Sequence, residues 1–433
     1  MTIKSTLLGA AALLLGMSAS AETIAITHAK IATMGKDGVI QNGTILVKDG
    51  RIAAVGSGVA VPAGARTIDA GGHLVTPGLV ATGTDLGATE VEGESTTVDA
   101  NGATDSLSAA FDVSLGINPA SMVIPPARMG GVTRAVVTPQ ISGRGGASKG
   151  EKLFAGQAAV IDLSGDPHSI TARHVAVMVD VGSAAAAHLG GSHASVLQAL
   201  EADLEEAASY GANKSGYEHG THRPYHMSRE DMEALQPVIS GKEPLVVGVH
   251  RVADIRRVIE LGKRLKLKLI LDGVEEGWLI AGEIAASGYP ALVDPQYDLP
   301  ESFEQLNARF ENAGILAAAG VRLAIEPPHS GDYARQVRYN AGYAVAHGMK
   351  WEAAMEALTH GPAVIFGFAE KEGSIEPGLE ADLVVWSGDP LEMLTLPEHV
   401  VIKGVEVPLT SRAQALARRY ATPDAAVPPT YRH

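Results

Sequence analysis

The stretch Val75-Thr-Pro-Gly-Leu-Val-Ala-Thr-Gly-Thr-Asp-Leu-Gly87 joins a β-rich N-terminal region to a long run of alternating strands and helices. Pro77 and Gly78 form a dipeptide that favours a turn. The apolar residues that follow, Leu79 to Ala81, are typical of a short buried strand. The stretch therefore predicts the passage from a small β domain into a larger α/β domain.

The β-rich segments lie near both ends of the chain. Residues 44–48 and 51–55 flank Asp49-Gly50, a strong hairpin signal. Residues 383–386 form an apolar run that indicates a strand, and residues 400–407 indicate a second hairpin. Because such small hairpins cannot bury a core alone, we expect the two ends to combine.

The middle of the chain alternates between strand and helix patterns. Residues 245–249, 267–271 and 321–325 are short apolar runs, whereas apolar residues recur at helical spacing through 255–265. A further helix is expected over residues 303–319. Strand–helix units that repeat every ~20–30 residues predict parallel strands with helical crossovers.

Two motifs give this frame a resemblance to a known family. Residues 75–87 resemble the T-P-G-L-(I/V)-D-x-H-x-H segment of the amidohydrolase superfamily, whose imidazolonepropionase- and dihydroorotase-like members are metal-dependent hydrolases. Residues 378–390 resemble the G-x-x-A-D-L-V-V-W-x-G-D-P signature near that family's C-terminus. The resemblance implies an α/β fold: a (β/α)₈ TIM barrel beside a small β-sandwich made from both chain ends.

The domain bounds follow from this resemblance. Residues 76–372 are expected to form the barrel, with active sites at the C-terminal ends of its strands. Residues 22–75 and 373–410 are expected to form the composite β-sandwich, and residues 411–433 a C-terminal tail.

The resemblance also implies a metal site. Metal-binding members of the family place a histidine pair after strand one, a carboxylated lysine or glutamate after strand four, single histidines after strands five and six, and an aspartate after strand eight. The histidine pair falls here on Gly83 and Asp85, and the aspartate that precedes it on Ala81. Asp85 can still donate an oxygen. We therefore expect Asp85 and His250 as ligands of a divalent metal, with zinc as the first choice and a metal-free barrel as the alternative.

The candidate catalytic residues follow strands five and eight. His250 matches the family's H-R-x-x-D-I segment, and a structural hydrogen-bonding role is its alternative. Within residues 324–332, Glu326 stands closest to the register of the expected aspartate. We predict His250 and Glu326 as catalytic, and Arg251 and His329 as substrate-binding.

The segment after strand six has acidic residues where the family has a histidine. Asp272, Glu275 and Glu276 are the nearest substitutes in this segment. Acidic residues are also common at helix N-termini, so they do not by themselves indicate a site. Further upstream, His188 and His193 are interpreted as helix-start or loop residues.

A separate histidine cluster precedes strand five. His219, His222 and His226 lie within eight residues, at spacings that resemble metal ligands on a helix. Gly220 and Pro224 make a helix unfavourable there. We predict these histidines as substrate-binding residues on a loop over the barrel mouth, with a polar surface loop as the alternative.

Composition limits the partners and the compartment. The formal charge of −15 over 433 residues argues against nucleic acid and anionic membrane surfaces, and the absence of cysteine excludes disulfides and thiolate chemistry. Residues 1–21 resemble a signal peptide, with Lys4 before an apolar run and Ala19-Ser-Ala21 as the cleavage site. We expect a periplasmic or secreted protein, cleaved after Ala21, without membrane insertion after cleavage.

Together these observations predict an exported amidohydrolase-family hydrolase of C–N bonds, with an altered metal site. The expected substrate is a small cyclic amide or a short peptide. The alternative is a catalytically inactive binding or regulatory subunit. The expected assembly is a homo-oligomer. The alternative, for the inactive subunit, is a complex with an active paralogue.

Overall fold

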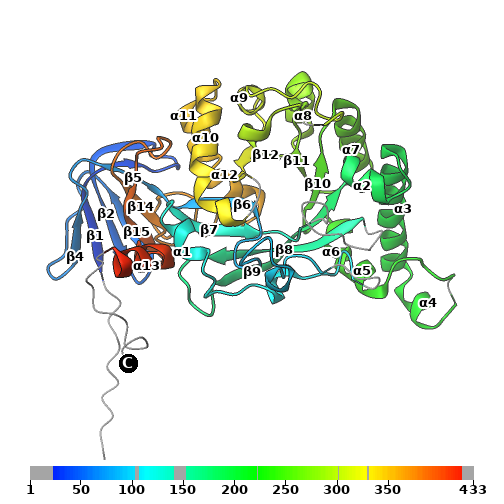
Figure 1. Ribbon diagram of the computed structural model, residues 1–433, viewed down its shortest axis with the longest axis horizontal. Coiled ribbons are helices and arrows are strands. Elements are labelled where there is room, and N and C mark those ends of the chain that lie inside the picture. Colours follow the sequence, from blue (N-terminus) through cyan, green and yellow to red (C-terminus); the bar gives the residue numbers. More distant parts are fainter. Residues whose placement is uncertain are drawn as a thin grey trace, which may run out of the picture.

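The computed structural model describes residues 23–102, 107–140, 153–221, 223–300, 302–328 and 331–421. The expected signal peptide, His222 and His329 lie outside these residues. Two eight-stranded sheets organise the described chain, one in the centre of the molecule and one at its side (Figure 1). In the described part of the chain, no helix has both the length and the apolar character needed to cross a membrane.

The central sheet is a barrel. Its strands are hydrogen-bonded in sequence order: β6 (Leu79–Thr84), β7 (Val132–Val137), β8 (Phe154–Asp162), β9 (Ile170–Asp180), β10 (Leu245–Val249), β11 (Leu269–Gly273), β12 (Ala291–Val293) and β13 (Leu323–Ile325). The first and last strands, β6 and β13, are in contact, so the ring is nearly closed. The predicted TIM barrel is confirmed.

One barrel strand runs against the others. β8 is antiparallel to both β7 and β9, whereas the remaining neighbours are parallel, so the expected all-parallel ring is wrong at this strand. Only residues 163–169 connect β8 to β9, too few for the helical crossover that parallel neighbours need. The loop after β6 packs against β8 instead: Gln157 N donates to Phe111 O at 2.7 Å, and Ser108 Oγ to Phe154 O at 2.9 Å.

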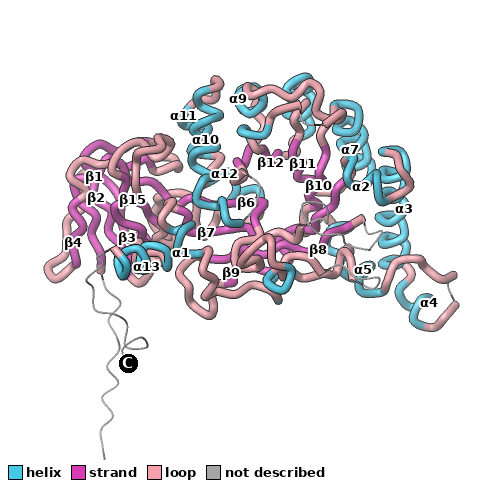
Figure 2. Tube along the Cα trace, viewed as in Figure 1, coloured by secondary structure: helices cyan, strands magenta, loops and turns pink. Residues whose placement is uncertain are grey.

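The α-helices of the described chain lie around the barrel strands, except α13, which lies beside the sandwich (Figure 2). They are α1 (Ile124–Arg128), α2 (Ser183–His188), α3 (His193–Ala212), α4 (Lys214–Glu218), α5 (Arg229–Ala234), α6 (Gln236–Ile239), α7 (Val252–Leu265), α8 (Ala281–Ser287), α9 (Asn312–Ala318), α10 (Val337–Ala346), α11 (Trp351–Glu356), α12 (His360–Ile365) and α13 (Arg412–Tyr420). Helix α7 buries Ile255, Val258 and Ile259 as its periodicity predicts. The helix expected over 303–319 is wrong in its first half, because α9 begins only at Asn312.

The second sheet combines both chain ends. It contains β1 (Ile24–Ala32), β2 (Val39–Lys48), β3 (Arg51–Gly56), β4 (Arg66–Asp69), β5 (Leu74–Pro77), β14 (Leu383–Trp386), β15 (Pro397–Ile402) and β16 (Val405–Glu406). β5 pairs antiparallel with β14, so that Pro77 lies opposite Leu383. The sheet encloses an apolar core of its own, which confirms the predicted composite β-sandwich.

A buried ionic cluster connects the barrel to the sandwich. Arg134 of β7 is 2% exposed. Its Nε lies 2.7 Å from Asp382 Oδ2 and its Nη2 2.6 Å from Glu380 Oε2, and Glu372 completes the cluster. All three carboxylates precede β14, so one barrel arginine holds the segment that leads into the sandwich.

Candidate functional site

His250 lies at the mouth of the barrel, directly after β10. Its ring is packed between two glycines that follow or end neighbouring strands. A Cβ added to Gly182 would lie 2.9 Å from His250 Nε2, and one added to Gly273 would lie 2.7 Å from Nδ1. Glycine at both positions therefore makes room for an imidazole at this point.

Glu275 fixes the orientation of the His250 ring. His250 Nδ1 donates to Glu275 Oε2 at 2.7 Å, and the other carboxylate oxygen accepts from Gln305 Nε2 at 2.8 Å. Asp180, at the end of β9, lies beside the same ring and accepts from Gly182 N at 2.7 Å. One imidazole is thus bound by Glu275 and flanked by Asp180.

The surrounding carboxylates decide the charge of His250. Burial alone would lower its pKa, but Glu275, Glu304 and Asp180 outweigh that effect and raise the pKa to about 10. The same contact with His250 lowers the pKa of Glu275 despite its burial, whereas burial raises the pKa of Asp180. At neutral pH, His250 is therefore an imidazolium with a proton on each ring nitrogen.

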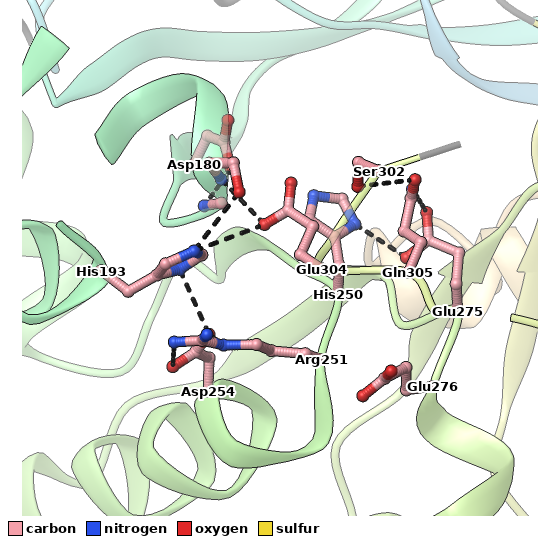
Figure 3. A network of polar contacts seen from close by, with 12 residues as sticks. Asp180, His193, His250, Arg251, Asp254, Glu275, Glu276, Ser302, Glu304 and Gln305 are labelled. Atoms are coloured by element: carbon pink, nitrogen blue, oxygen red, sulfur yellow. Dashed lines mark hydrogen bonds and ion pairs between the residues drawn. The ribbon is translucent and has the colours of Figure 1, made fainter. Parts of the chain in front are cut away.

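A loop after β12 lies beside the His250–Glu275 pair. We call residues 302–307 the mouth strap. Glu304 Oε2 accepts from Ser183 N at 2.8 Å, and Asn307 Nδ2 donates to Glu276 Oε1 at 2.8 Å. Figure 3 shows Glu304 and Gln305 lying between His193 and Glu275. The strap thus links the loops that follow β9 and β11 across the mouth.

His193 brings a second imidazole to the mouth. Its Nε2 lies 3.9 Å from Glu304 Oε2, and its Nδ1 lies 3.2 Å from Asp254 Oδ2. Asp254 is 2% exposed and also pairs with Arg251, whose Nη2 donates to Asp254 Oδ1 at 3.2 Å (Figure 3). The guanidinium predicted to bind substrate is thus paired with Asp254 on α7.

Glu326 and Asp85 follow β13 and β6. A Cβ added to Gly83, where φ is +63°, would lie only 1.9 Å from Glu326 Oε1. The Glu326 carboxylate therefore occupies the space of a side chain at position 83. This is the position at which the sequence resemblance implies the first metal-binding histidine.

Comparisons with known proteins decide the family. The model of the Amidohydrolase family matches residues 166–407, which is more than half of the chain. The chain belongs to the amidohydrolase family. This assignment fits the barrel, the composite sandwich and the position of His250 at a strand end.

Two solved structures and one curated protein resemble the chain. The crystal structure of an amidohydrolase from Thermotoga maritima MSB8 is 25% identical with a TM-score of 0.78, covering 89% of this chain and 99% of that one. A zinc-bound adenosine deaminase from Xanthomonas campestris is 17% identical with a TM-score of 0.50, covering 91% and 96%. The amidohydrolase tasK of Hapsidospora irregularis is 35% identical over 71 residues, 16% of this chain but only 7% of that protein.

Amidohydrolases are generally metal-dependent, and the described residues can be tested against that requirement. Among the residues that the structure describes, no three His, Asp or Glu side chains form a group that could hold a metal ion. Glu326 fills the space beside Gly83, and His250 donates Nδ1 to Glu275. The described side chains therefore do not fit the family's ligand set, and Asp85 and His250 as ligands stay a prediction.

The described part of the segment between α4 and α5, which carries His219 and His226, lies near the lower end of α3 at the edge of the molecule (Figure 1). His226 contacts two carboxylates of α3, with Nε2 2.8 Å from Asp203 Oδ1 and Nδ1 2.7 Å from Glu206 Oε2. His219 Nδ1 lies 2.7 Å from Ser215 O of α4. These contacts tie both histidines to their own side of the molecule, and their substrate-binding role stays a prediction.

Replacing Gln305 with alanine is expected to lower the free energy of unfolding by about 1–2 kcal/mol, because a buried carboxylate loses a hydrogen bond. Urea unfolding measures this loss. Gln41→Ala, on the exposed face of β2, is the matched control and should change stability by less than about 0.5 kcal/mol. Equal stabilities of the two variants would show that the strap does not hold Glu275.

Proposed function

We propose that this amidohydrolase hydrolyses a C–N bond in a small cyclic amide or a short peptide, with its chemistry centred on His250. One observation carries the proposal: the His250–Glu275 pair, fixed at 2.7 Å, stands at the C-terminal end of β10. That end is where TIM-barrel enzymes place their active sites. The signal-like residues 1–21 support a second element of the proposal, export to the periplasm or the medium.

The roles follow from the charges of the side chains. His250, as an imidazolium, would donate a hydrogen bond to the substrate and then give its proton to the departing amine nitrogen. Glu326, which follows β13, the last strand of the barrel, would accept the proton of the attacking water. The water oxygen forms the new bond to the carbonyl carbon, and the C–N bond breaks. Glu275 would hold the imidazolium in place throughout.

His250→Asn is expected to lower kcat/KM by about 100-fold on any amide that the wild-type protein hydrolyses. A panel of cyclic amides and dipeptides, followed by amine release, provides the measurement. His28→Asn, at an exposed position of the sandwich, is the matched control and should retain wild-type kcat/KM. Retention of activity within twofold in His250→Asn would overturn the assignment of the reaction to this residue.

The metal is tested separately by elemental mass spectrometry of the purified protein. On the proposed mechanism, activity does not follow zinc content. An equivalent of zinc, lost together with activity on chelation, would overturn it in favour of the family's metal-centred reaction.

A second candidate function is a non-catalytic binding or regulatory subunit. The observation that favours it is the mismatch between the described mouth residues and the family's ligand set. Under this candidate, wild-type protein binds members of the same panel in calorimetry but releases no amine, alone or with zinc. Turnover of any member would exclude it.

A further inference from the structure

A cavity opens at the opposite end of the barrel from His250. Its volume is about 740 Å³, within the range of small-molecule sites. It lies where β10 and β11 begin, whereas His250 follows the end of β10. Its walls include the apolar side chains Pro244, Leu267, Ile270, Tyr289, Ile365 and Phe366. We call this space the basal cavity; the proposed hydrolysis makes no use of it.

Glu243 lines the basal cavity with a buried carboxyl group. The residue is 6% exposed, and its Oε1 has no hydrogen-bond partner among the described residues. Burial raises its pKa to about 7. A buried carboxylate without a partner costs free energy, and a ligand cation beside it would remove that cost.

The rim of the cavity has the opposite charge. Lys242, Lys268 and Arg322 all line it and are exposed. No ion pair joins any of the three to a described carboxylate, so their charges are available to an incoming anion. The cavity thus has a buried acidic group, apolar walls and a basic rim.

We propose that the basal cavity binds a short apolar peptide with free termini. Its ammonium group lies against Glu243, its apolar side chains contact the cavity walls, and its terminal carboxylate faces the basic rim. A simple amine would meet the three rim cations without compensation, and a simple carboxylate would leave Glu243 unpartnered. Only a ligand with both charges and an apolar body satisfies all three parts of the cavity.

Calorimetry with leucyl-phenylalanine tests the proposal, using His250→Asn so that hydrolysis contributes little heat. The free dipeptide is expected to bind, whereas its N-acetylated and C-amidated forms should each bind at least about tenfold more weakly. The comparison uses one protein, so it does not depend on the folding of a further variant. Absence of binding at millimolar dipeptide, or equal binding of the N-acetylated form, would overturn the proposal.

A substitution in the cavity gives the second arm. Adding Glu243→Gln to His250→Asn keeps the shape of the side chain and is expected to weaken dipeptide binding at least about tenfold. Lys263→Met, at an exposed position of α7 outside the cavity lining, should leave it unchanged. Equal dipeptide binding by His250→Asn and by the double variant His250→Asn, Glu243→Gln would contradict the proposal. Glu243→Gln alone should keep wild-type hydrolysis, because Glu243 is far from His250 at the other end of the barrel. The binding proposal and the hydrolysis proposal can therefore be refuted separately.

Discussion

Arg134→Met is expected to lower the free energy of unfolding by about 3–5 kcal/mol, because it leaves buried carboxylates without their cation. Arg134 is 2% exposed, and its guanidinium contacts Asp382, Glu380 and Glu372 together. Methionine fills much of the same volume but carries no charge and donates no hydrogen bond. The loss should appear as early separation of the sandwich from the barrel.

The pH dependence of this loss has a definite sign. Burial and the neighbouring carboxylates already raise the pKa of Glu372 well above its usual value, although Arg134 opposes them. Without Arg134, the folded-state pKa of Glu372 rises further, so the folded variant takes up a proton at a pH at which the unfolded chain does not. The loss of unfolding free energy caused by Arg134→Met is therefore smaller at pH 5 than at pH 8.

Urea unfolding at both pH values measures the effect. Arg51→Met is the matched control, because Arg51 lies 3.9 Å from the same Glu380 but is 55% exposed. It should cost less than about 1 kcal/mol. A loss below about 1 kcal/mol for Arg134→Met as well would show that the cluster does not hold the two domains together.

Gly83→His, which restores the family's residue, is expected to destabilise the protein by about 2–4 kcal/mol without creating a zinc site. Two separate effects add up. Position 83 has φ of +63°, a conformation that strains any residue with a Cβ, and the new Cβ would lie 1.9 Å from Glu326 Oε1. The carboxylate would have to leave its place before an imidazole could enter.

Gly83→Ala and the double variant Gly83→Ala, Glu326→Ala separate these effects. The alanine variant keeps both the strained backbone and the clash, whereas the double variant keeps only the strain and should recover about 1–2 kcal/mol relative to Gly83→Ala. Urea unfolding and elemental analysis are the measurements. A stable Gly83→His protein that holds one equivalent of zinc would refute this account of the mouth.

Much of the fold was predictable from the sequence. Several strands of both sheets, such as residues 245–249 and 383–386, appear as short apolar runs, and the motifs near the two chain ends predict that these segments combine. β8 and β9 were not predicted. The reversal of β8 was not predictable, because strand direction depends on the partner and leaves no mark in the periodicity of residues 154–162. The first half of the 303–319 helix is absent because this segment makes contacts across the mouth instead. Phe303 is 92% exposed, and Glu304 accepts a hydrogen bond from Ser183 N.

The site was predictable in part, from the family motif at His250 and from the acidic residues after strand six, which include Glu275. His250 was found because residues 250–255 match the family's H-R-x-x-D-I segment, directly after the apolar run 245–249. Asp180 also follows an apolar run directly and could have been found by that position. His193 is the first residue of α3, and Glu304 lies in the mouth strap. Contacts across the mouth aim both side chains, and the sequence indicated a helix start for His193 but no role in the site.

The pairing of β5 with β14 has a consequence for synthesis on the ribosome. Pro77 meets Leu383, so the first half of the sandwich is made about 300 residues before its partner strand. At 5–20 residues per second this delay is roughly 15–60 s. During that interval the early hairpins present an unpaired edge, a known hazard for aggregation. We expect the edge of β5 to stay without its partner strand until translation is nearly complete.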